Sequence, residues 1–475
     1  MDRWFALHGA PQPQRFPHGA GMSDEISFSA AGYLESLWDP KTQEWFGSLN
    51  GPNMMASLGW HPAYMYDLHY AQVMARDEGV KDACRARLAL VKQLSGQRPV
   101  GDDMGFEFGN PVASLIGQAD HIGGLMRAQG EDGSWRFHAR IEKSGIFAGM
   151  DYAELGPDQA AEVGTCAQTA YTILRYARMT GDAQATAAGL KALQFMNRFT
   201  VPRAAQVWEV PVHTPDVLAS ADACEAYLEG YLITGDAALL KQAVFWARTG
   251  LPFIYMWDTP GYEALRYASI PVMGASWYTC NWFGRPVQWN GLRLARAYAK
   301  LDAYDRSYPW RQMAEGLTIS TMWQQHGAQT GGDIWPDTHE KWVGLWPDNF
   351  DSVTLRRCPW VFAPRQILDV LYRLYGMHPS PETVTLTQNG QTIRLNACAA
   401  ISGAKWEGER LTATVGCRPP QTSQIVVCNI ARPQSVKVDG EALPETPRLS
   451  NAPGLGWEYF PTCRALCIKP TEASQ

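Results

Sequence analysis

The sequence contains few charged residues, no clustered cysteines and no long apolar run. Charged residues make up 19% of the 475 residues and hydrophobic residues 46%, a balance that is typical of a folded chain and not of a disordered one. Lys and Arg number 41 against 47 Asp and Glu, without a basic cluster, so nucleic-acid binding is disfavoured. Arg248 interrupts the most apolar segment, residues 243–257, and a membrane span is not expected.

The ten cysteines are too sparse for a disulfide scaffold, and none belongs to a Cys-x-x-Cys pair. Structural zinc is therefore not expected, and His339 and Glu340 lack the spaced third ligand that a metal site needs. The amino terminus becomes polar and rich in proline before a hydrophobic signal region develops. We expect no metal, no cofactor and, unless the sequence has been trimmed, a cytoplasmic location; the oligomeric state stays open.

Two copies of a Thr-Gly-Asp tripeptide mark an internal repeat in a region of helical periodicity. The copies are at 180–182 and 234–236, and each is followed by a further helical run. Glycine readily adopts the left-handed conformation that ends a helix, and aspartate caps the amino terminus of the next one. Each tripeptide therefore predicts the turn of a helical hairpin.

Helical periodicity extends from about residue 58 to 376, with almost no alternating strand pattern. Further hairpins and helices are expected at 60–94 (with a break near 77–79), 286–325 (with a break near 304–309), 111–129 and 359–375. The series approaches six pairs. A single hairpin cannot bury its apolar face, so the pairs must stack, either as a closed ring of inner and outer helices or as an open solenoid.

The composition changes after residue 378. Short β-branched or alternating runs, separated by Gly, Pro and Asn, predict strands; they are 384–387, 392–396, 411–415, 425–429, 435–438, 457–460 and 465–469. The predicted fold is mainly α: an (α/α)6-type toroid over 1–378 that carries the catalytic site, followed by a small β-sandwich domain over 379–475.

An irregular stretch at 207–216 places Trp208, Glu209, His213 and Asp216 just before a predicted helix. In a ring of hairpins, the loops that precede the inner helices lie at one mouth, where a substrate would bind. Glu209 and His213 are therefore the leading acid/base candidates, with Trp208 as a substrate-binding residue. Asp216 is interpreted as the helix cap, and a structural loop histidine is the alternative for His213.

Asp222 and Glu225 lie three residues apart on one face of the same predicted helix. A buried carboxylate without a partner is costly. We therefore expect both side chains to be exposed.

A second aromatic stretch, 276–291, leads into the next inner helix and should reach the same mouth. It offers a phenol for catalysis, together with stacking rings, an amide and a guanidinium that suit a sugar. The catalytic candidate is Tyr278, and the substrate-binding candidates are Trp277, Asn281, Trp282, Arg285 and Trp289. A tryptophan-rich helix crossing without a binding role is the alternative.

A third stretch, 331–342, is a long acidic and aromatic connection. Such connections inside a compact helical domain are more often lids or binding loops than filler. Asp333 and Asp337 are possible catalytic partners of Glu209, and Trp335 is a further binding candidate.

The run at 129–135, Gln-Gly-Glu-Asp-Gly-Ser-Trp, has the pattern that follows an inner helix in many α/α-toroids. Glutamine can bond carbonyls that the helix leaves free, glycine makes the turn, and tryptophan packs back on the hairpin. The terpenoid cyclases share the pattern, but their acidic Asp-x-Asp-Asp run is missing here, so that activity is set aside.

With this turn, the helical repeats and the β domain, the chain resembles the (α/α)-toroid glycan-degrading enzymes, both six-hairpin glycosidases and toroidal polysaccharide lyases. It is also similar to uncharacterised bacterial proteins of this architecture. The resemblance implies an enzyme acting on a poly- or oligosaccharide, but no catalytic signature carries over residue by residue.

Hydrolysis would need two carboxylates beside the scissile bond, about 5–5.5 Å apart for retention or about 6.5–9.5 Å apart for inversion. Glu209 with Asp333 or Asp337 would supply them. The acidic residues in all three stretches favour this reaction.

β-Elimination on a uronic-acid glycan is the alternative. Asn281 or Arg285 would neutralise the uronate, while His213 or Tyr278 would remove the ring proton. A non-catalytic helical-repeat binding module is a further alternative.

Overall fold

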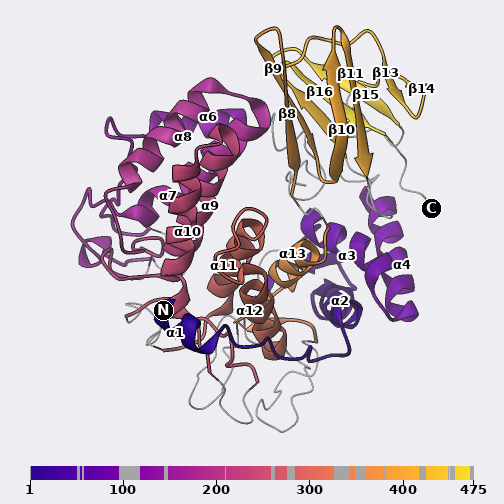
Figure 1. The fold of residues 1–475 in the computed structure, drawn as a ribbon. Helices are drawn as coiled ribbons and strands as arrows, with labels where there is room; N and C mark the ends of the chain where they lie inside the picture. Colours follow the sequence, from indigo (N-terminus) through magenta and orange to yellow (C-terminus); the bar gives the residue numbers. More distant parts are fainter. Residues whose placement is uncertain are drawn as a thin grey trace. The chain divides into compact units, whose positions relative to one another are not determined.

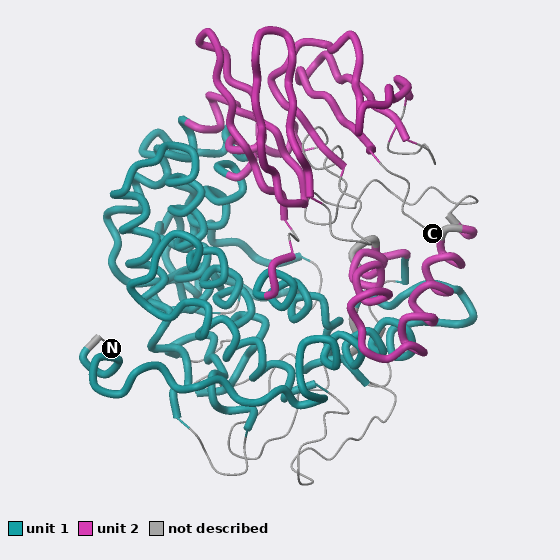
Figure 2. The backbone as a smooth tube through the Cα atoms, turned by 45° about the vertical axis from the view of Figure 1, so that its right-hand side comes forward, with its two compact units in different colours: residues 1–59, 125–174, 187–374 teal, residues 60–124, 175–186, 375–475 magenta. Residues whose placement is uncertain are grey.

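The computed structural model describes residues 2–50, 54–55, 58–95, 118–143, 148–208, 210–257, 263–274, 284–325, 343–347, 360–377, 380–416, 424–447, 449 and 455–470. These residues are rich in helix up to 377 and rich in strand beyond it (Figure 1). The chain divides into two compact units (Figure 2). Unit 1 comprises Met1–Gly59, Leu125–Leu174 and Ala187–Leu374, and unit 2 comprises Trp60–Gly124, Arg175–Thr186 and Tyr375–Gln475.

Unit 1 holds most of the described helices. They are α1 (Asp2–His8), α2 (Met22–Ala31) with a π-helical turn at Gly32–Ser36, α7 (Val163–Thr180), α8 (Ala183–Met196), α9 (Val217–Thr234), α10 (Ala237–Thr249), α11 (Gln288–Leu301), α12 (Trp310–Gln324) and α13 (Arg365–Leu374). Short 3₁₀ turns lie at Tyr152–Glu154 and Leu251–Phe253. The unit boundary cuts α6 (Ala119–Arg127), the last turns of α7 and the first turn of α8.

Both Thr-Gly-Asp tripeptides form the predicted helical turns. Gly181 and Gly235 adopt left-handed φ values of 75° and 72°. Asp182 Oδ1 accepts the amide of Ala185 at 2.8 Å, and Asp236 Oδ1 accepts the amide of Ala238 at 2.8 Å. The capping mechanism inferred from the sequence is therefore confirmed at both turns.

Helices α9 and α11 pack side by side and run in the same direction. Asp222 of α9 pairs with Arg293 of α11, and one turn further along α9 Glu225 pairs with Arg296 and Lys300. The partners ascend in the same order on both helices, which only a parallel arrangement allows. Helices α10 and α12 pack against α9 and α11 as the second arms of their hairpins.

Short strands that the helical periodicity does not predict occur in unit 1. One antiparallel sheet contains β1 (Trp38–Asp39), β2 (Glu44–Phe46) and β5 (Leu58–Gly59), and another contains β3 (Ser48–Asn50), β4 (Met54–Met55), β6 (Trp346–Pro347) and β7 (Trp360–Phe362). Strand β7 occupies the start of the helix expected at 359–375, which begins instead at Arg365. The run Trp-Val-Phe favours strand, and Pro364 disfavours helical backbone in the residue before it.

The amino-terminal segment 10–15 forms a strap whose main-chain carbonyls are bound by side chains of unit 1. Gln312 donates to the carbonyls of Ala10 and Pro11, at 3.2 and 2.8 Å, and Tyr267 also donates to Pro11. Arg266 donates to the carbonyl of Gln12, and Trp323 donates to the carbonyl of Arg15, each at 3.0 Å. The strap is thus bound along its length.

Unit 2 contains α3 (Pro62–Met74), α4 (Glu78–Ser95) and the carboxyl-terminal strands. The strands are β8 (Glu382–Gln388), β9 (Gln391–Ala397), β10 (Ala400–Glu407), β11 (Arg410–Gly416), β12 (Ile425–Cys428), β13 (Val436–Val438), β14 (Glu441–Leu443), β15 (Gly456–Phe460) and β16 (Ala465–Lys469). An antiparallel five-stranded sheet has the order β15-β16-β12-β9-β8, and β10–β11 and β13–β14 form separate ribbons. All predicted strand positions are confirmed, whereas β10 and β14 were not foreseen.

Candidate active site

Four of the predicted site residues lie in the described part of the chain: Trp208, His213, Arg285 and Trp289. The others lie outside the described residues; they are Glu209, Trp277, Tyr278, Asn281, Trp282, Asp333, Trp335 and Asp337. The described site is therefore built from the segments around 160–165, 202–217, 254–273 and 284–290.

The loops that precede α7, α9 and α11 are joined by backbone hydrogen bonds. Segment 202–203 accepts the amides of Gly164, in the first turn of α7, and of Asp216 at 2.8 and 2.9 Å. Segment 269–271 accepts the amides of Val217 and Val287, each at 2.9 Å. The amino ends of three helices are thus connected, as expected of loops that share one mouth.

His213 forms a hydrogen-bonded pair with a carboxylate that the sequence analysis did not single out. Its Nδ1 lies 2.8 Å from Glu162 Oε1, and Arg203 Nη1 lies 3.7 Å from the same oxygen. The Glu162 side chain is only 9% exposed, whereas that of His213 is 60% exposed. A carboxylate that accepts from Nδ1 fixes the ring and leaves Nε2 as the nitrogen for proton transfer.

Glu162 directly precedes α7, the position that Asp216 occupies before α9. This placement directly before a helix is the signal in the sequence that could have identified it. Its partner His213 is distant in sequence, so the pair becomes evident only when the loops are placed side by side.

Trp208, in the loop before α9, and Trp289, in the first turn of α11, bring two half-buried indoles together. Their ring centroids are 6.0 Å apart and their planes are tilted by 31°. Trp208 also packs against the apolar cluster that contains Val212, the neighbour of His213. The aromatic pair and the His213–Glu162 pair therefore belong to one region of unit 1.

The segment before α11 is held in place on both sides of Arg285. Tyr255 donates its hydroxyl to the carbonyl of Gly284 at 2.5 Å, and the amide of Val287 bonds to Ser269. Arg285 is half-buried between them. Its guanidinium thus starts from an ordered backbone, which lowers the entropy lost when a polar group binds a ligand.

Asp216 is the amino-terminal cap of α9, as the sequence predicts. Its Oδ1 accepts the amide of Ala219 at 2.8 Å and its Oδ2 the amide of Ala205 at 3.0 Å. The residue is 1% exposed. Burial raises its pKa to about 7, against the opposing effect of the two amides.

The expectation that Asp222 and Glu225 are exposed is wrong. Both are buried. Asp222 pairs with Arg293, and Glu225 pairs with Arg296 and Lys300. Burial alone would raise the pKa of Glu225, but the two cations outweigh it and hold that pKa well below its usual range. For Asp222 burial prevails, and its pKa is raised. Cations on α11 supply the partners that make burial of these acids tolerable.

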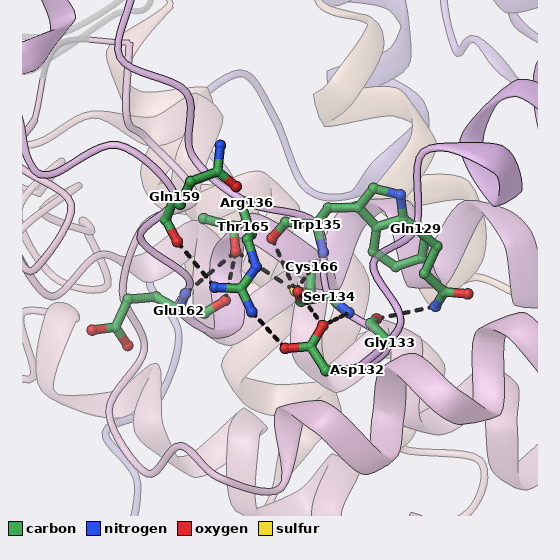
Figure 3. A network of polar contacts seen from close by, with 10 residues as sticks. All are labelled: Gln129, Asp132, Gly133, Ser134, Trp135, Arg136, Gln159, Glu162, Thr165 and Cys166. Atoms are coloured by element: carbon green, nitrogen blue, oxygen red, sulfur yellow. Dashed lines mark hydrogen bonds and ion pairs between the residues drawn. The ribbon is translucent and has the colours of Figure 1, made fainter.

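The turn at 129–136 is a connected polar network (Figure 3). Gln129 Nε2 donates to the carbonyls of Gly133 and Ala188 at 3.0 and 2.9 Å. Trp135 Nε1 donates back to the carbonyl of Leu125 at 3.0 Å. The inferred roles of glycine, at Gly133 with a φ of 94°, and of Trp135 are confirmed. Gln129 was expected to bond the carbonyls at the helix end, but it binds its own turn and α8 instead. In Figure 3 the carboxylate of Glu162 points away from this network, toward its separate partners.

Within the described ranges, no helix is long and apolar enough to cross a membrane. The same residues contain no group of three His, Cys, Asp or Glu side chains that could hold a metal ion.

Comparisons with known proteins find similarity in structure only. No family model matches the chain, and no curated protein sequence matches it. The structure is similar to an unsaturated glucuronyl hydrolase from Bacillus sp. GL1, responsible for the degradation of glycosaminoglycan, with a TM-score of 0.43 and 12% identity over 74% of this chain and 94% of that one.

Two further similar structures are also unsaturated glucuronyl hydrolases. The enzyme from Streptococcus agalactiae has a TM-score of 0.44 and 10% identity, over 76% of this chain and 94% of that one. One specific for heparin has a TM-score of 0.39 and 11% identity, over 74% and 97%. TM-scores and identities this low give no basis for assigning a family or a reaction to this chain.

Proposed function

We propose that this protein is a glycoside hydrolase that cleaves glycosidic bonds of a poly- or oligosaccharide. One observation carries the proposal: an indole pair, Trp208–Trp289, and an imidazole–carboxylate pair, His213–Glu162, occupy one region at the joined amino ends of three helices. Indole faces suit the apolar faces of sugar rings, and the imidazole is a group that can transfer a proton.

In this proposal Glu209 is the general acid, and Asp333 or Asp337 is the second carboxylate. Glu209 follows Trp208, one member of the indole pair, directly in the sequence. The acid protonates the leaving oxygen, while the second carboxylate attacks the sugar or activates water. Tyr278 remains a catalytic candidate, and the remaining binding candidates are Trp277, Asn281, Trp282, Arg285 and Trp335.

The proposal includes the architecture. The parallel α9 and α11, with α10 and α12 as second arms, are what an (α/α)6 toroid requires of its inner and outer helices. We assign the toroid to 1–378 and a β-sandwich domain to 379–475.

β-Elimination on a uronic-acid glycan is the second candidate, and the His213–Glu162 pair favours it. With Nδ1 bonded to Glu162, Nε2 of a neutral imidazole is free to remove a ring proton. Arg285, from the ordered segment before α11, would neutralise the uronate.

A panel of neutral and uronic-acid polysaccharides distinguishes the two reactions. Hydrolysis gives new reducing ends without near-ultraviolet absorption, whereas elimination gives an unsaturated product that absorbs there. We expect reducing ends alone. Absorbing product would establish elimination, and binding without turnover of any glycan would establish a binding module.

The variant Glu209→Gln tests the assigned acid. The amide keeps the shape of the side chain and loses its proton, so kcat should fall by about 100-fold or more with KM little changed. Glu131→Gln, at an exposed glutamate of the 129–136 turn, is the matched control and should keep full activity. Full activity of Glu209→Gln would remove that residue from the mechanism.

A further inference from the structure

A cavity lies among residues of unit 2, whereas the candidate active site is built from unit 1. Its volume is about 350 Å³, at the lower end of the roughly 300–1,000 Å³ range of small-molecule pockets. The α7–α8 turn supplies Tyr176, Thr180 and Asp182, and the β15–β16 turn supplies Thr462 and Arg464. The cavity thus joins one of the two Thr-Gly-Asp turns to the β domain.

Several polar groups of this cavity have unused hydrogen-bonding capacity. Tyr176 is 9% exposed, and within the described chain its hydroxyl has no hydrogen-bond partner. Burial raises the pKa of Tyr176 to about 12, helped by the neighbouring Asp182, so the hydroxyl remains a donor at neutral pH. Among the same residues, Arg464 forms no ion pair, and Asp182 uses only Oδ1, for the helix cap. Tyr176 is buried, where polar groups normally have partners, while Asp182 is half-buried and Arg464 is exposed. A ligand that enters the cavity can therefore reach all three.

The chemistry of the lining defines the class of ligand. Asp182 and Arg464 carry opposite charges, so the cavity has no net attraction for an ion of either sign. A carboxylate accepts from hydroxyl groups, a guanidinium donates a fork of N–H groups to neighbouring oxygens, and a tyrosine ring offers an apolar face. A neutral ring with adjacent hydroxyl groups can interact with the carboxylate, the guanidinium and the tyrosine ring.

We propose that this cavity binds one neutral sugar residue, as a glycan-binding site separate from the candidate active site. Binding there involves no bond cleavage and does not depend on the proposed function.

The second Thr-Gly-Asp turn provides a matched control. Asp236 caps α10 as Asp182 caps α8. Asp236 accepts the amide of Ala238, two residues on, and Asp182 accepts that of Ala185, three residues on, at 2.8 Å in each case. At the first turn the hydroxyl of Thr180 donates to the carbonyl of Tyr176, four residues earlier. At the second turn the hydroxyl of Thr234 donates to the carbonyl of Gly230, also four residues earlier. The second turn therefore keeps the cap but lacks the tyrosine.

Calorimetric titration of the full chain with glucose, galactose, mannose, maltose and cellobiose tests the proposal. At least one of these sugars should bind. Arg464→Asn, which tolerates the left-handed φ of 50° at this position, and Asp182→Asn, which keeps a capping side chain, should each weaken that binding by about tenfold or more. Asp236→Asn should leave it unchanged.

Turnover of a short glycan should be the same in Arg464→Asn as in the wild type, which separates this site from the active site. The proposal is overturned if none of the five sugars binds at its solubility limit, or if both pocket variants bind like the wild type. Binding of glycine in place of a sugar, lost in Arg464→Asn, would also overturn it, because the cavity would then select a zwitterion.

Discussion

Helix α9 begins at a buried aspartate and ends beside an exposed one. Asp216 caps α9 and is almost inaccessible, while its second oxygen binds the amide of Ala205 in the preceding loop. Asp236, just after α9, caps α10 and lies at the surface. Each carboxylate accepts one helix amide at 2.8 Å, from the third residue after Asp216 and from the second residue after Asp236, so both serve as caps. What differs is the number of elements that each carboxylate connects.

The buried part of α9, like its cap Asp216, is connected to neighbouring elements by polar side chains. Asp222 and Glu225 bind cations of α11, and Lys300 also donates to the hydroxyl of Tyr171 in α7 at 3.1 Å. In this half, polar side chains connect neighbouring helices, whereas at the far end they serve their own turn. Polar residues that connect several elements also fix the loops that carry His213 and Trp208.

The largest effect should come from the charge at the centre of the buried half. Glu225→Gln leaves Arg296 and Lys300 without their counter-charge, and we expect the free energy of unfolding to fall by about 3–5 kcal/mol. Urea denaturation measures it. Glu78→Gln, in the exposed Glu78–Lys81 pair, should cause little change. Equal effects of the two variants would contradict the comparison.

Removal of the two caps compares the ends of α9 directly. Asp216→Ala removes a cap and also leaves the partly buried amide of Ala205 without its acceptor, so we expect a loss of about 2–3 kcal/mol. Asp236→Ala removes only an exposed cap, so about 1 kcal/mol should be lost. Thermal and urea unfolding measure the loss of unfolding free energy in each variant. Equal losses would show that burial of the cap does not matter.

The variant Trp208→Ala tests whether the loop before α9 also binds sugar. Loss of one stacking face should weaken affinity for the glycan substrate by about 1–2 kcal/mol, seen as a higher KM. Trp208→Phe keeps an aromatic face and should retain most of the affinity. An unchanged KM in Trp208→Ala would assign this indole to packing alone.

The pH dependence of stability should have opposite signs at the two buried acids. The folded-state pKa of Asp216 is raised to about 7, so its contribution is complete below pH 4 and is lost as the pH rises toward 7. Glu225 has a lowered pKa, so its contribution is lost as the pH falls below about 4.5.

The slope from Asp216 can reach at most about 1.4 kcal/mol per pH unit, the value for uptake of one proton. Asp216→Asn should flatten the unfolding free energy between pH 4 and 7. Asp236→Asn, at the exposed cap, should leave the profile unchanged. A profile that stays steep in Asp216→Asn would show that another group titrates.

Local features of the fold could be predicted from the sequence, and long-range ones could not. The Thr-Gly-Asp turns, the Asp216 cap and most carboxyl-terminal strands depend on neighbouring residues, and these predictions are confirmed. Exposure of Asp222 and Glu225 was predicted wrongly because it depends on Arg293, Arg296 and Lys300 of a distant helix. Glu162 was missed for the same reason, since its importance depends on where His213 lies.

The amino-terminal strap, residues 10–15, is bound through its main-chain carbonyl groups. Side chains of Arg266, Tyr267, Gln312 and Trp323 bind its carbonyl groups, and every residue type presents the same carbonyl. The identity of residues 10–12 is therefore weakly constrained by these contacts, while the spacing between successive carbonyls is strongly constrained. Substitutions in the strap should be accepted readily, but insertion or deletion of one residue would shift every acceptor away from its donor.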